Sequence, residues 1–275
     1  MKVRRFGEAS AFLDRAESWL LREEAENGLF LGVATSLLGP HRFRAPIYLA
    51  TVEDRGRIVG CAFRTPPYHP VITRLPLECV AGLVADFGRV YGTLPGVQGP
   101  TSEAEAFAAA WCRRTGRRGV VGFRLKLHVL TEVTRPVPVA PGWLRAAVES
   151  DLELAARWAV GFVRDTGVDT SPEEFGEHLL RAGALYLWDD EAPRCMVAVN
   201  RTSMNGATIG AVYTPPEFRG RGYASAAVAE LSQRLLDAGR RFCTLYADLA
   251  NPTSNKIYRA VGFRPRTEVV LLRFA

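Results

Sequence analysis

The sequence contains no long run of apolar residues. Although 48% of its 275 residues are hydrophobic, no segment reaches the ~20 consecutive apolar residues that a membrane-spanning helix needs. Residues 1–8 are not followed by the apolar core of a signal peptide. We therefore expect a soluble cytoplasmic protein with no membrane partner, long enough for one large domain or two of medium size.

Cysteine is scarce and irregularly spaced. The cysteines are odd in number, form no Cys-x-x-Cys pair and have no nearby histidine at a metal-binding spacing. They are Cys61, Cys79, Cys112, Cys195 and Cys243. We expect buried, reduced thiols rather than a disulfide framework or a zinc site, and no metal.

Lysine is rarer still, with only Lys2, Lys126 and Lys256 among 35 basic residues. The net charge of +6 is uneven, because residues 201–275 carry eleven basic and five acidic side chains, while residues 1–200 carry 24 of each. No dense basic stripe with interleaved aromatics is present, so nucleic acid is not an expected partner. A local positive field of this kind suits a phosphorylated small molecule.

The positive segment contains a glycine loop between a strand and a helix. Residues 207–213 are β-branched and aromatic enough for a strand, and residues 225–238 have the apolar spacing of a helix. Gly220 and Gly222 allow the backbone to turn its N–H groups outward, and the first N–H groups of a helix have no partner inside it. This arrangement predicts a phosphate-binding loop.

Three kinds of phosphate loop can be compared with this segment. A P-loop NTPase requires Gly-Lys-Ser/Thr, and no lysine lies near the loop. A dinucleotide fold would use Gly220-x-Gly222-x-x-Ser225, but residues 215–219 separate these glycines from the strand. The third pattern, Arg-x-x-Gly-x-Ala, is present as Arg219, Gly222 and Ala224, and it resembles the pyrophosphate loop of the GNAT superfamily of acyl-CoA-dependent N-acyltransferases.

A second motif downstream strengthens this resemblance. A strand at residues 242–247 is followed by Asn251, by Tyr258 seven positions later, and by Gly262-Phe263. In the superfamily, a strand of this kind leads to Asn, a short helix with Tyr, and then Gly-Phe. The amino-acid sequence of residues 213–220 and 248–255 is also similar to that of a group of bacterial two-part GNAT proteins.

The element order predicts two similar halves. Each half reads as two helices, a hairpin, a helix, a strand or turn, a helix and a strand, and residues 65–67 (Thr-Pro-Pro) echo residues 214–216. The expected division is a first domain at 1–134, a Pro-rich linker at 135–142 and a second domain at 143–275. A chance coincidence of α/β element order is the alternative.

The resemblance implies an α/β (α+β) fold with two GNAT-like domains, each a mixed, mostly antiparallel central sheet flanked by helices. Residues 68–74, which follow the first Thr-Pro-Pro, contain no glycine to expose backbone N–H groups. We therefore expect the first copy to be degenerate and the second to hold acetyl-CoA.

The superfamily's site carries over to this chain at the residues that match its motifs. The expected acetyl-CoA contacts are backbone groups at the end of the fourth strand, the loop, and the start of the following helix, with neighbours after the fifth strand. They are Val212, Tyr213, Thr214, Arg219, Gly220, Arg221, Gly222, Tyr223, Ala224, Ser225, Asn251, Ser254, Asn255 and Lys256.

Two residues are candidates for acid–base catalysis. Tyr258 is the candidate general acid that returns a proton to the departing CoA thiolate, because a phenol with a pKa of ~10 can donate to an alkyl thiolate. Many superfamily members carry a glutamate on the fourth strand, but residues 207–213 contain no carboxylate. Asp248 is the nearest acid and either acts as the base or merely turns the chain.

The sequence therefore predicts an N-acetyltransferase that moves an acetyl group from acetyl-CoA to a primary amine of a small molecule or peptide by direct attack in a ternary complex. A non-catalytic acyl-CoA-binding sensor or scaffold is the alternative, and a dinucleotide-binding protein is a third. The expected acceptor lining is Tyr186, Trp188, Tyr213 and Tyr246, with core packing as the other interpretation of these aromatics. The acceptor's identity, and whether the protein is a monomer or a homodimer, are open.

Overall fold

The computed structural model describes residues 1–39, 46–168 and 170–275. The chain divides into two compact units. The first contains Met1–Leu127, Asp248–Ala250 and Arg266–Ala275, and the second contains His128–Ala247 and Asn251–Pro265. No helix in these ranges is both long and apolar enough to cross a membrane.

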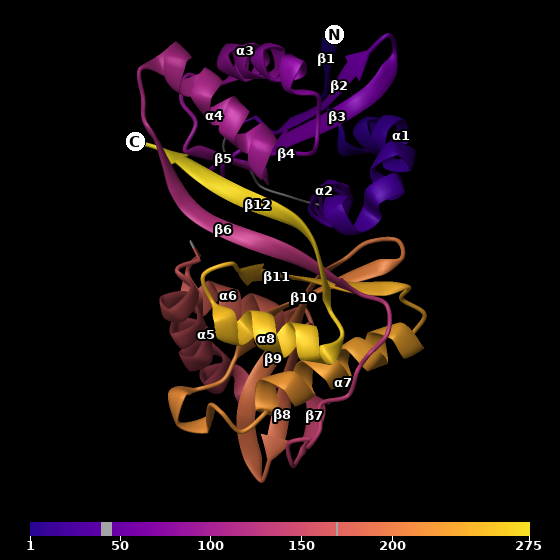
Figure 1. Ribbon diagram of the computed structural model, residues 1–275, viewed down its shortest axis with the longest axis vertical. Helices are drawn as coiled ribbons and strands as arrows, with labels where there is room; N and C mark the ends of the chain where they lie inside the picture. The colour runs from indigo at the N-terminus through magenta and orange to yellow at the C-terminus, as the bar shows by residue number, and fades with distance from the viewer. Residues whose placement is uncertain (40–45, 169) are drawn as a thin grey trace. The chain divides into compact units, whose positions relative to one another are not determined.

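The first unit is a mixed sheet with helices on both faces (Figure 1). Its elements are β1 (Lys2–Phe6), α1 (Ala9–Leu20), α2 (Glu24–Ser36), β2 (Tyr48–Asp54), β3 (Arg57–Arg64), β4 (Val71–Ile72), α3 (Val80–Val90), β5 (Gly96–Pro100), α4 (Thr101–Thr115), β6 (Gly119–Leu130) and β12 (Arg264–Phe274). The strand order is β1-β2-β3-β4-β5-β12-β6. Pairing is antiparallel at β1/β2, β2/β3, β3/β4 and β5/β12, and parallel at β4/β5.

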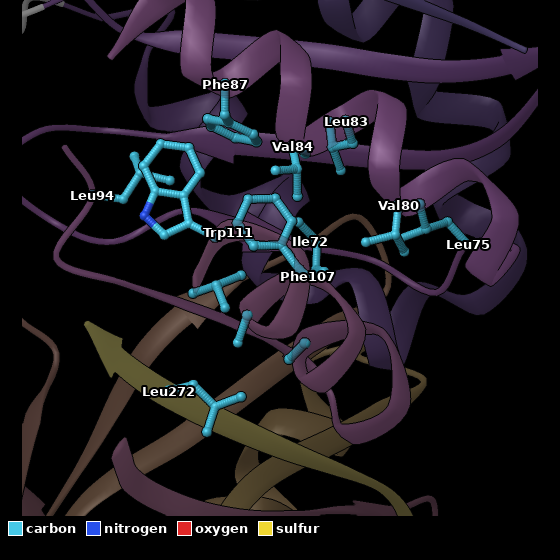
Figure 2. Packing of buried hydrophobic residues seen from close by; sticks show 14 of the residues in the cluster. Ile72, Leu75, Val80, Leu83, Val84, Phe87, Leu94, Phe107, Trp111 and Leu272 are labelled. Carbon is cyan, nitrogen blue, oxygen red and sulfur yellow. The ribbon is translucent and has the colours of Figure 1, made fainter. Parts of the chain in front are cut away.

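Both faces of this sheet are buried, which explains why β2 and β3 read as nearly continuous apolar runs. On one face, α3 and α4 pack through Phe87, Phe107 and Trp111, which are almost fully buried (Figure 2). The Tyr48 ring stacks on Phe87 with a centroid separation of 4.0 Å. On the other face, α1 and α2 pack in a second cluster that includes Leu49. Neighbouring residues of β2 thus pack into hydrophobic cores on opposite faces of the sheet.

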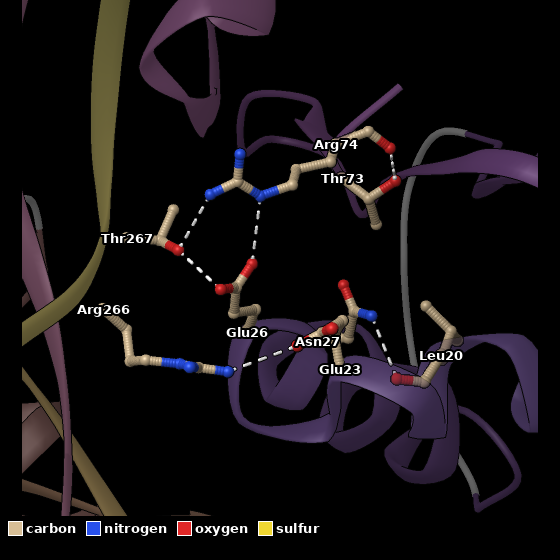
Figure 3. A network of polar contacts seen from close by, with 8 residues as sticks. All are labelled: Leu20, Glu23, Glu26, Asn27, Thr73, Arg74, Arg266 and Thr267. Carbon is tan, nitrogen blue, oxygen red and sulfur yellow. Dashed lines mark hydrogen bonds and ion pairs between the residues drawn. The ribbon is translucent and has the colours of Figure 1, made fainter. Parts of the chain in front are cut away.

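The last strand of the chain, β12, completes the first unit's sheet. Its residues Val270, Leu272 and Phe274 are buried in the cluster that α3 and α4 form, and Figure 2 shows Leu272 there. Polar contacts fix its beginning, because Thr267 donates to Glu26 at 2.7 Å and Arg74 contacts both Glu26 and Thr267 (Figure 3). These residues lie in the first unit, whereas the sequence placed all of 143–275 in a second domain.

The second unit has the same architecture around a smaller sheet (Figure 1). Its elements are β7 (Trp143–Ala146), α5 (Leu152–Thr166), α6 (Pro172–Arg181), β8 (Leu185–Asp190), β9 (Ala192–Thr202), β10 (Gly206–Tyr213), α7 (Tyr223–Asp237), β11 (Phe242–Asp248) and α8 (Pro252–Val261). The strand order is β11-β10-β9-β8-β7, antiparallel except for the parallel pair β10/β11. The expected mixed, mostly antiparallel sheet flanked by helices is confirmed.

Two helix pairs cover the faces of this sheet. Helices α7 and α8 pack on one face through Ile209 and Leu245, and α5 and α6 pack on the other through Met196 and Ala211. Trp188 packs on the α7 side and donates to the Pro141 carbonyl oxygen at 2.8 Å. Short 3₁₀ turns precede α2, α3, α5 and the loop before α7, at Leu21–Glu23, Leu77–Cys79, Glu149–Asp151 and Pro216–Phe218.

The element order along the chain repeats one for one. The series β1, α1, α2, β2, β3, β4, α3, β5, α4, β6 is matched by β7, α5, α6, β8, β9, β10, α7, β11, α8, β12. By this match, β12 corresponds to β6, yet β12 pairs with β5 of the first series. The chain's final strand therefore completes the sheet of the first unit rather than its own.

Candidate functional site

The loop after β10 has the geometry expected of an anion-binding turn. Gly220 has φ +77° and Gly222 has φ +82°, a region of backbone conformation that residues with a Cβ adopt only with strain. Gly222 is the N-cap of α7, and no side chain caps this end. Helix geometry leaves the first N–H groups of α7, from Tyr223 to Ser225, without partners inside the helix. The helix dipole adds positive potential there.

The two loop arginines lie in different surroundings. Arg219 Nε donates to the Thr214 carbonyl oxygen at 2.9 Å, and its Nη2 pairs with Asp165 Oδ2 of α5 at 2.5 Å. Burial works to raise the pKa of the Asp165 carboxyl, but hydrogen bonds from Arg219 and Arg164 outweigh it and keep that pKa low. Both arginines are exposed, but Arg219 braces the loop through these contacts, whereas Arg221 lies beside the loop glycines.

Tyr223 anchors the start of α7 to the sheet. Its side chain is buried, and its hydroxyl donates to Asp190 Oδ2 of β8 at 2.6 Å. That hydrogen bond raises the pKa of Tyr223. The side chain thus holds the helix start, and only its backbone N–H is available as an expected acetyl-CoA contact.

A β-bulge interrupts β10 just before the loop. The pairing with β9 passes from Gly210↔Ala198 to Tyr213↔Met196, so three steps on β10 match two on β9. Ala211 has φ +49°, which is unusual for a residue with a side chain. A bulge leaves one residue's backbone groups outside the regular ladder and bends the strand. The bulge lies beside Val212 and Thr214, two of the expected contacts.

Strands β10 and β11 separate as they approach the loop. Their parallel pairing covers Gly206↔Phe242, Ala207↔Cys243 and Thr208↔Thr244. β10 then continues to Tyr213 and β11 to Asp248, with no further pair between them in this described segment. The facing edges of the two strand ends are therefore unpaired with each other, and edge groups of this kind can bind an extended ligand.

Tyr258 lies in α8 with its side chain buried in the core between α7, α8 and the sheet. Its ring packs edge-on against Phe263 at 6.2 Å between centroids. Burial, reinforced by the nearby Cys195 sulfur, raises the pKa of Tyr258 above its usual value of 10.0. The hydroxyl therefore stays protonated at neutral pH, but it is a weaker acid than the sequence argument assumed.

Cys195 and Thr214 lie close to this tyrosine. Burial raises the pKa of Cys195 to about 12, with the Thr214 side chain and the Tyr213 backbone acting in the opposite direction. The Thr214 hydroxyl oxygen is buried and forms no hydrogen bond of good geometry with the described residues. A buried polar atom without a partner is costly, and at the end of β10 it fits a place where a ligand supplies that partner.

The residues after β11 have mainly structural contacts. Asp248 is exposed and accepts a hydrogen bond from the Ala250 N–H at 2.9 Å, and it belongs to the first unit, whereas Tyr258 belongs to the second. Asn251 is the N-cap of α8, accepting from the Ser254 N–H at 3.0 Å, and Asn255 donates to its carbonyl oxygen. Lys256 is exposed on the same helix.

The aromatic residues expected to line the acceptor site divide between the two faces. Tyr186 and Trp188 pack in the α7 core, and Tyr213 is buried under α5 near Trp158. Tyr246 lies on the other face of β11 from Leu245. Core packing thus accounts for three of the four.

One feature that the sequence did not predict is a row of polar side chains, Arg201, Thr208, Thr244 and Tyr246, on one face of the second unit's sheet. This row is called the polar row below. Thr208 and Thr244 are buried and hydrogen-bonded to each other at 2.9 Å, and Arg201 pairs with Thr208 across the sheet. The available signal was an arginine near the end of a largely apolar strand. No sequence signal marks the bulge at Ala211. In the described ranges, no group of three or more His, Cys, Asp or Glu side chains could hold a metal ion.

A family model described as FR47-like protein matches residues 192–272, which span the bulge, the loop and Tyr258. No curated protein sequence matches the chain.

Solved structures resemble the whole chain at low sequence identity. A Drosophila protein has a TM-score of 0.72 at 10% identity, covering 99% of this chain and 98% of its own. A GCN5-related N-acetyltransferase from Sphaerobacter thermophilus has a TM-score of 0.61 at 16% identity over 99% and 94%. A tandem GNAT protein from the clavulanic acid biosynthesis pathway has a TM-score of 0.53 at 15% identity over 100% and 98%. These matches show that the chain has the tandem GNAT-like fold over its whole length.

Proposed function

We propose that this chain, which has the fold of the GNAT acetyltransferases, transfers an acetyl group from acetyl-CoA to a primary amine by direct attack in a ternary complex. The observation that carries the proposal is the order of three structural features at the end of β10. A bulge at Ala211 is followed by a buried Thr214 hydroxyl beside the Cys195 thiol and by two positive-φ glycines that open α7. This arrangement fits a thioester, a pantetheine chain and a pyrophosphate in that order.

The binding step uses mostly backbone groups. The N–H groups at the start of α7 and at Gly220 and Gly222 would bind the pyrophosphate, with Arg221 adding charge. Val212 and Thr214 would pair with the pantetheine amides along the free edge of β10. Ser254, Asn255 and Lys256 are proposed neighbours of the nucleotide, and Asn251 supports them by capping α8.

The transfer step forms a C–N bond and breaks the C–S bond of the thioester. Backbone N–H groups at the bulge would stabilise the negative charge that develops on the carbonyl oxygen. The Tyr258 hydroxyl would give its proton to the departing thiolate, and the attacking amine would lose one to solvent or to Asp248. Because burial raises the pKa of Tyr258, a close thiolate is needed to draw the proton away.

We also propose that the first copy does not bind acyl-CoA. Between Thr65 and Val80, the described segment that corresponds to the loop, no residue has a positive φ, and β4 is only two residues long. The backbone there lacks the outward-turned N–H groups that Gly220 and Gly222 allow. One acetyl-CoA per chain is the expected stoichiometry.

Replacement of Tyr258 tests the chemistry. Tyr258→Phe should lower kcat by about 100-fold or more while leaving acetyl-CoA affinity within a few-fold, because general acid catalysis typically contributes a factor of 10²–10⁴. The assay follows CoA thiol release over a panel of primary amines. Tyr68→Phe, at an exposed tyrosine of the first unit, is the matched control and should keep wild-type rates.

Asp248→Asn belongs in the same assay. An asparagine oxygen can still accept the hydrogen bond from the Ala250 N–H, so the turn should be kept. A loss of rate would therefore indicate that Asp248 acts as the base, and an unchanged rate would indicate that it only stabilises the turn. Acetyl-CoA binding without thiol release on any amine would contradict the transferase and favour an acyl-CoA sensor.

A further inference from the structure

The polar row on the second unit's sheet is continuous across three strands. Thr208 of β10 and Thr244 of β11 share a hydrogen bond, and their Cα atoms are register partners. Arg201 of β9 is the register partner of Thr208 on its other side, and directly opposed residues point to the same face. Tyr246 follows two residues after Thr244 and therefore lies on that face as well.

The polar row lies on the face of the sheet opposite to α7 and α8. The residues that point to the opposite face, Ile209, Leu245 and Ala247, are buried against α7 and α8. On the polar row's own face, α5 and α6 pack on Met196, Ala198 and Ala211. The polar row lies on the same face as these apolar residues but further along the strands, where the side chains of β9, β10 and β11 are polar.

Arg201 differs from Arg145, another partly buried arginine of this unit. Arg145 pairs with Asp151 and Asp189 at 2.6 Å each. Arg201 is also partly buried, but among the described residues no carboxylate lies within 4.0 Å of it and no acceptor hydrogen-bonds to it. Burial lowers the pKa of Arg201, and the Tyr246 side chain acts in the opposite direction. A desolvated cation without a counter-charge costs stability, which an anionic ligand would recover.

The row also lies at a suitable distance from the reaction centre. Pairing of β10 with β11 ends at Thr208 and Thr244, so the gap between the strands begins there. The bulge at Ala211 is three residues further along β10, about 10 Å in an extended strand. An acceptor that places its amine at the bulge would extend its other end over Thr208 toward Arg201.

We propose that Arg201, with Thr208, Thr244 and Tyr246, binds a carboxylate of the acceptor, so that the substrate is a primary amine bearing a carboxylate several bonds away. Arginine presents a planar fork of donors that matches a carboxylate, and the hydroxyls of the row can complete its hydrogen bonds. Glycine, whose amine and carboxylate are adjacent, is too short to reach from the bulge to the row. The longer chain of ε-aminocaproate, with five methylene groups between its amine and its carboxylate, is suited to that distance. This inference rests on the proposed acetyl transfer.

Two matched amines test the preference. Wild-type protein should acetylate ε-aminocaproate with a kcat/KM at least 10-fold above that for hexylamine, which lacks only the carboxylate. Arg201→Gln should remove most of this preference, lowering kcat/KM for ε-aminocaproate by about 10- to 100-fold, as expected for a lost hydrogen bond to a charged group, and leaving hexylamine unchanged. Arg201→Lys should restore part of it. Arg241→Gln, which removes an exposed charge before β11, should change neither amine.

A binding measurement separates this inference from the proposed reaction. Calorimetry compares ε-acetamidocaproate with N-hexylacetamide, the products of the two amines, on wild type and Arg201→Gln. Tighter binding of the acid that depends on Arg201 supports the carboxylate site, even if no amine is acetylated and the transferase proposal fails. Equal binding of acid and neutral amide to wild type, or a preference that survives in Arg201→Gln, would overturn it. Arg201→Gln should melt no lower than wild type, because it removes an unpaired charge.

Discussion

At the scale of single residues, the second unit concentrates its unusual groups around the end of β10. Tyr258 and Cys195 are both buried with raised pKa values, and the Thr214 hydroxyl beside them has no well-formed partner in the described chain. Each of these states costs stability in the absence of a ligand. Perturbed groups gathered at one place are typical of functional sites.

The buried Cys195 thiol predicts a loss of stability in alkaline solution. Its pKa rises from 9.0 in the exposed chain to about 12 in the fold. A raised folded-state pKa contributes stability that is complete below pH 9 and is lost as the pH rises toward 12, by at most about 1.4 kcal/mol per pH unit for this group. Urea unfolding at pH 8 and pH 10, under reducing conditions, should show this loss.

Cys195→Ala provides the comparison for that experiment. The variant should start less stable, because it removes a buried sulfur, but its stability should fall less steeply between pH 8 and pH 10. Equal slopes for the variant and wild type would show that the Cys195 thiol ionises as easily in the fold as in the unfolded chain.

At the scale of elements, the loop and the two helices that follow β10 and β11 could be predicted from the sequence. Glycines at 220 and 222 indicated a turn with exposed N–H groups, and both have positive φ. Asn251-Pro252 is a typical helix start, and Asn251 caps α8. The phosphate contact expected of Arg219 stays a prediction, and the fold adds a contact with Asp165, which is 54 residues away in the sequence. A contact so distant depends on the tertiary arrangement, which residue patterns in the loop do not contain.

Substitution of a loop glycine tests the element that binds pyrophosphate. Gly222→Ala has room for the added methyl, since the nearest atom, Ala140 Cβ, is 3.6 Å away, but its φ of +82° imposes about 1–2 kcal/mol of backbone strain. The loop should relax and lose its N–H geometry, which weakens acetyl-CoA binding by more than 10-fold in a calorimetric titration.

The matched control for that experiment is Gly239→Ala. Gly239 follows the other end of α7, has φ +92° and has open space around it. The substitution should lower stability by a similar amount and leave acetyl-CoA affinity unchanged. If both variants bound equally well, the loop's conformation would not be the determinant of binding.

At the scale of the whole molecule, the sequence predicted the repeated element order but not the destination of the last strand. The pattern of β12 indicates a strand with apolar residues on one face, and nothing in that pattern specifies which neighbour it pairs with. Its partner depends on contacts such as Trp111 with Phe274, whose ring centroids are 6.1 Å apart, and Glu26 with Thr267. The division expected at 135–142 therefore differs from the two units at residues 128–134, 248–250 and 266–275.

A close backbone contact tests whether β12 completes the first unit. A Cβ added at Gly96 would lie 2.4 Å from the Leu272 carbonyl oxygen, a clash with backbone that side-chain rotation cannot relieve. Gly96→Ala should push β12 from β5 and destabilise the protein by about 1–3 kcal/mol, as overpacking does. Urea unfolding measures this change.

The control for this contact is Gly92→Ala, just before β5, where an added Cβ meets nothing within 4 Å. It should change stability by less than about 0.5 kcal/mol, as most surface substitutions do. Equal stabilities for Gly96→Ala and Gly92→Ala would mean that β12 does not lie against β5 in solution.

The central claim, that the second unit holds acetyl-CoA at the β10 end and the first unit does not, is tested most directly by calorimetric titration of the intact protein with acetyl-CoA. The account predicts saturable binding of one molecule per chain, with NAD and NADP binding more weakly. Binding of two molecules would contradict the assignment of a degenerate first copy. No binding at all by the wild-type chain, with residues 219–225 intact, would contradict the proposed function itself.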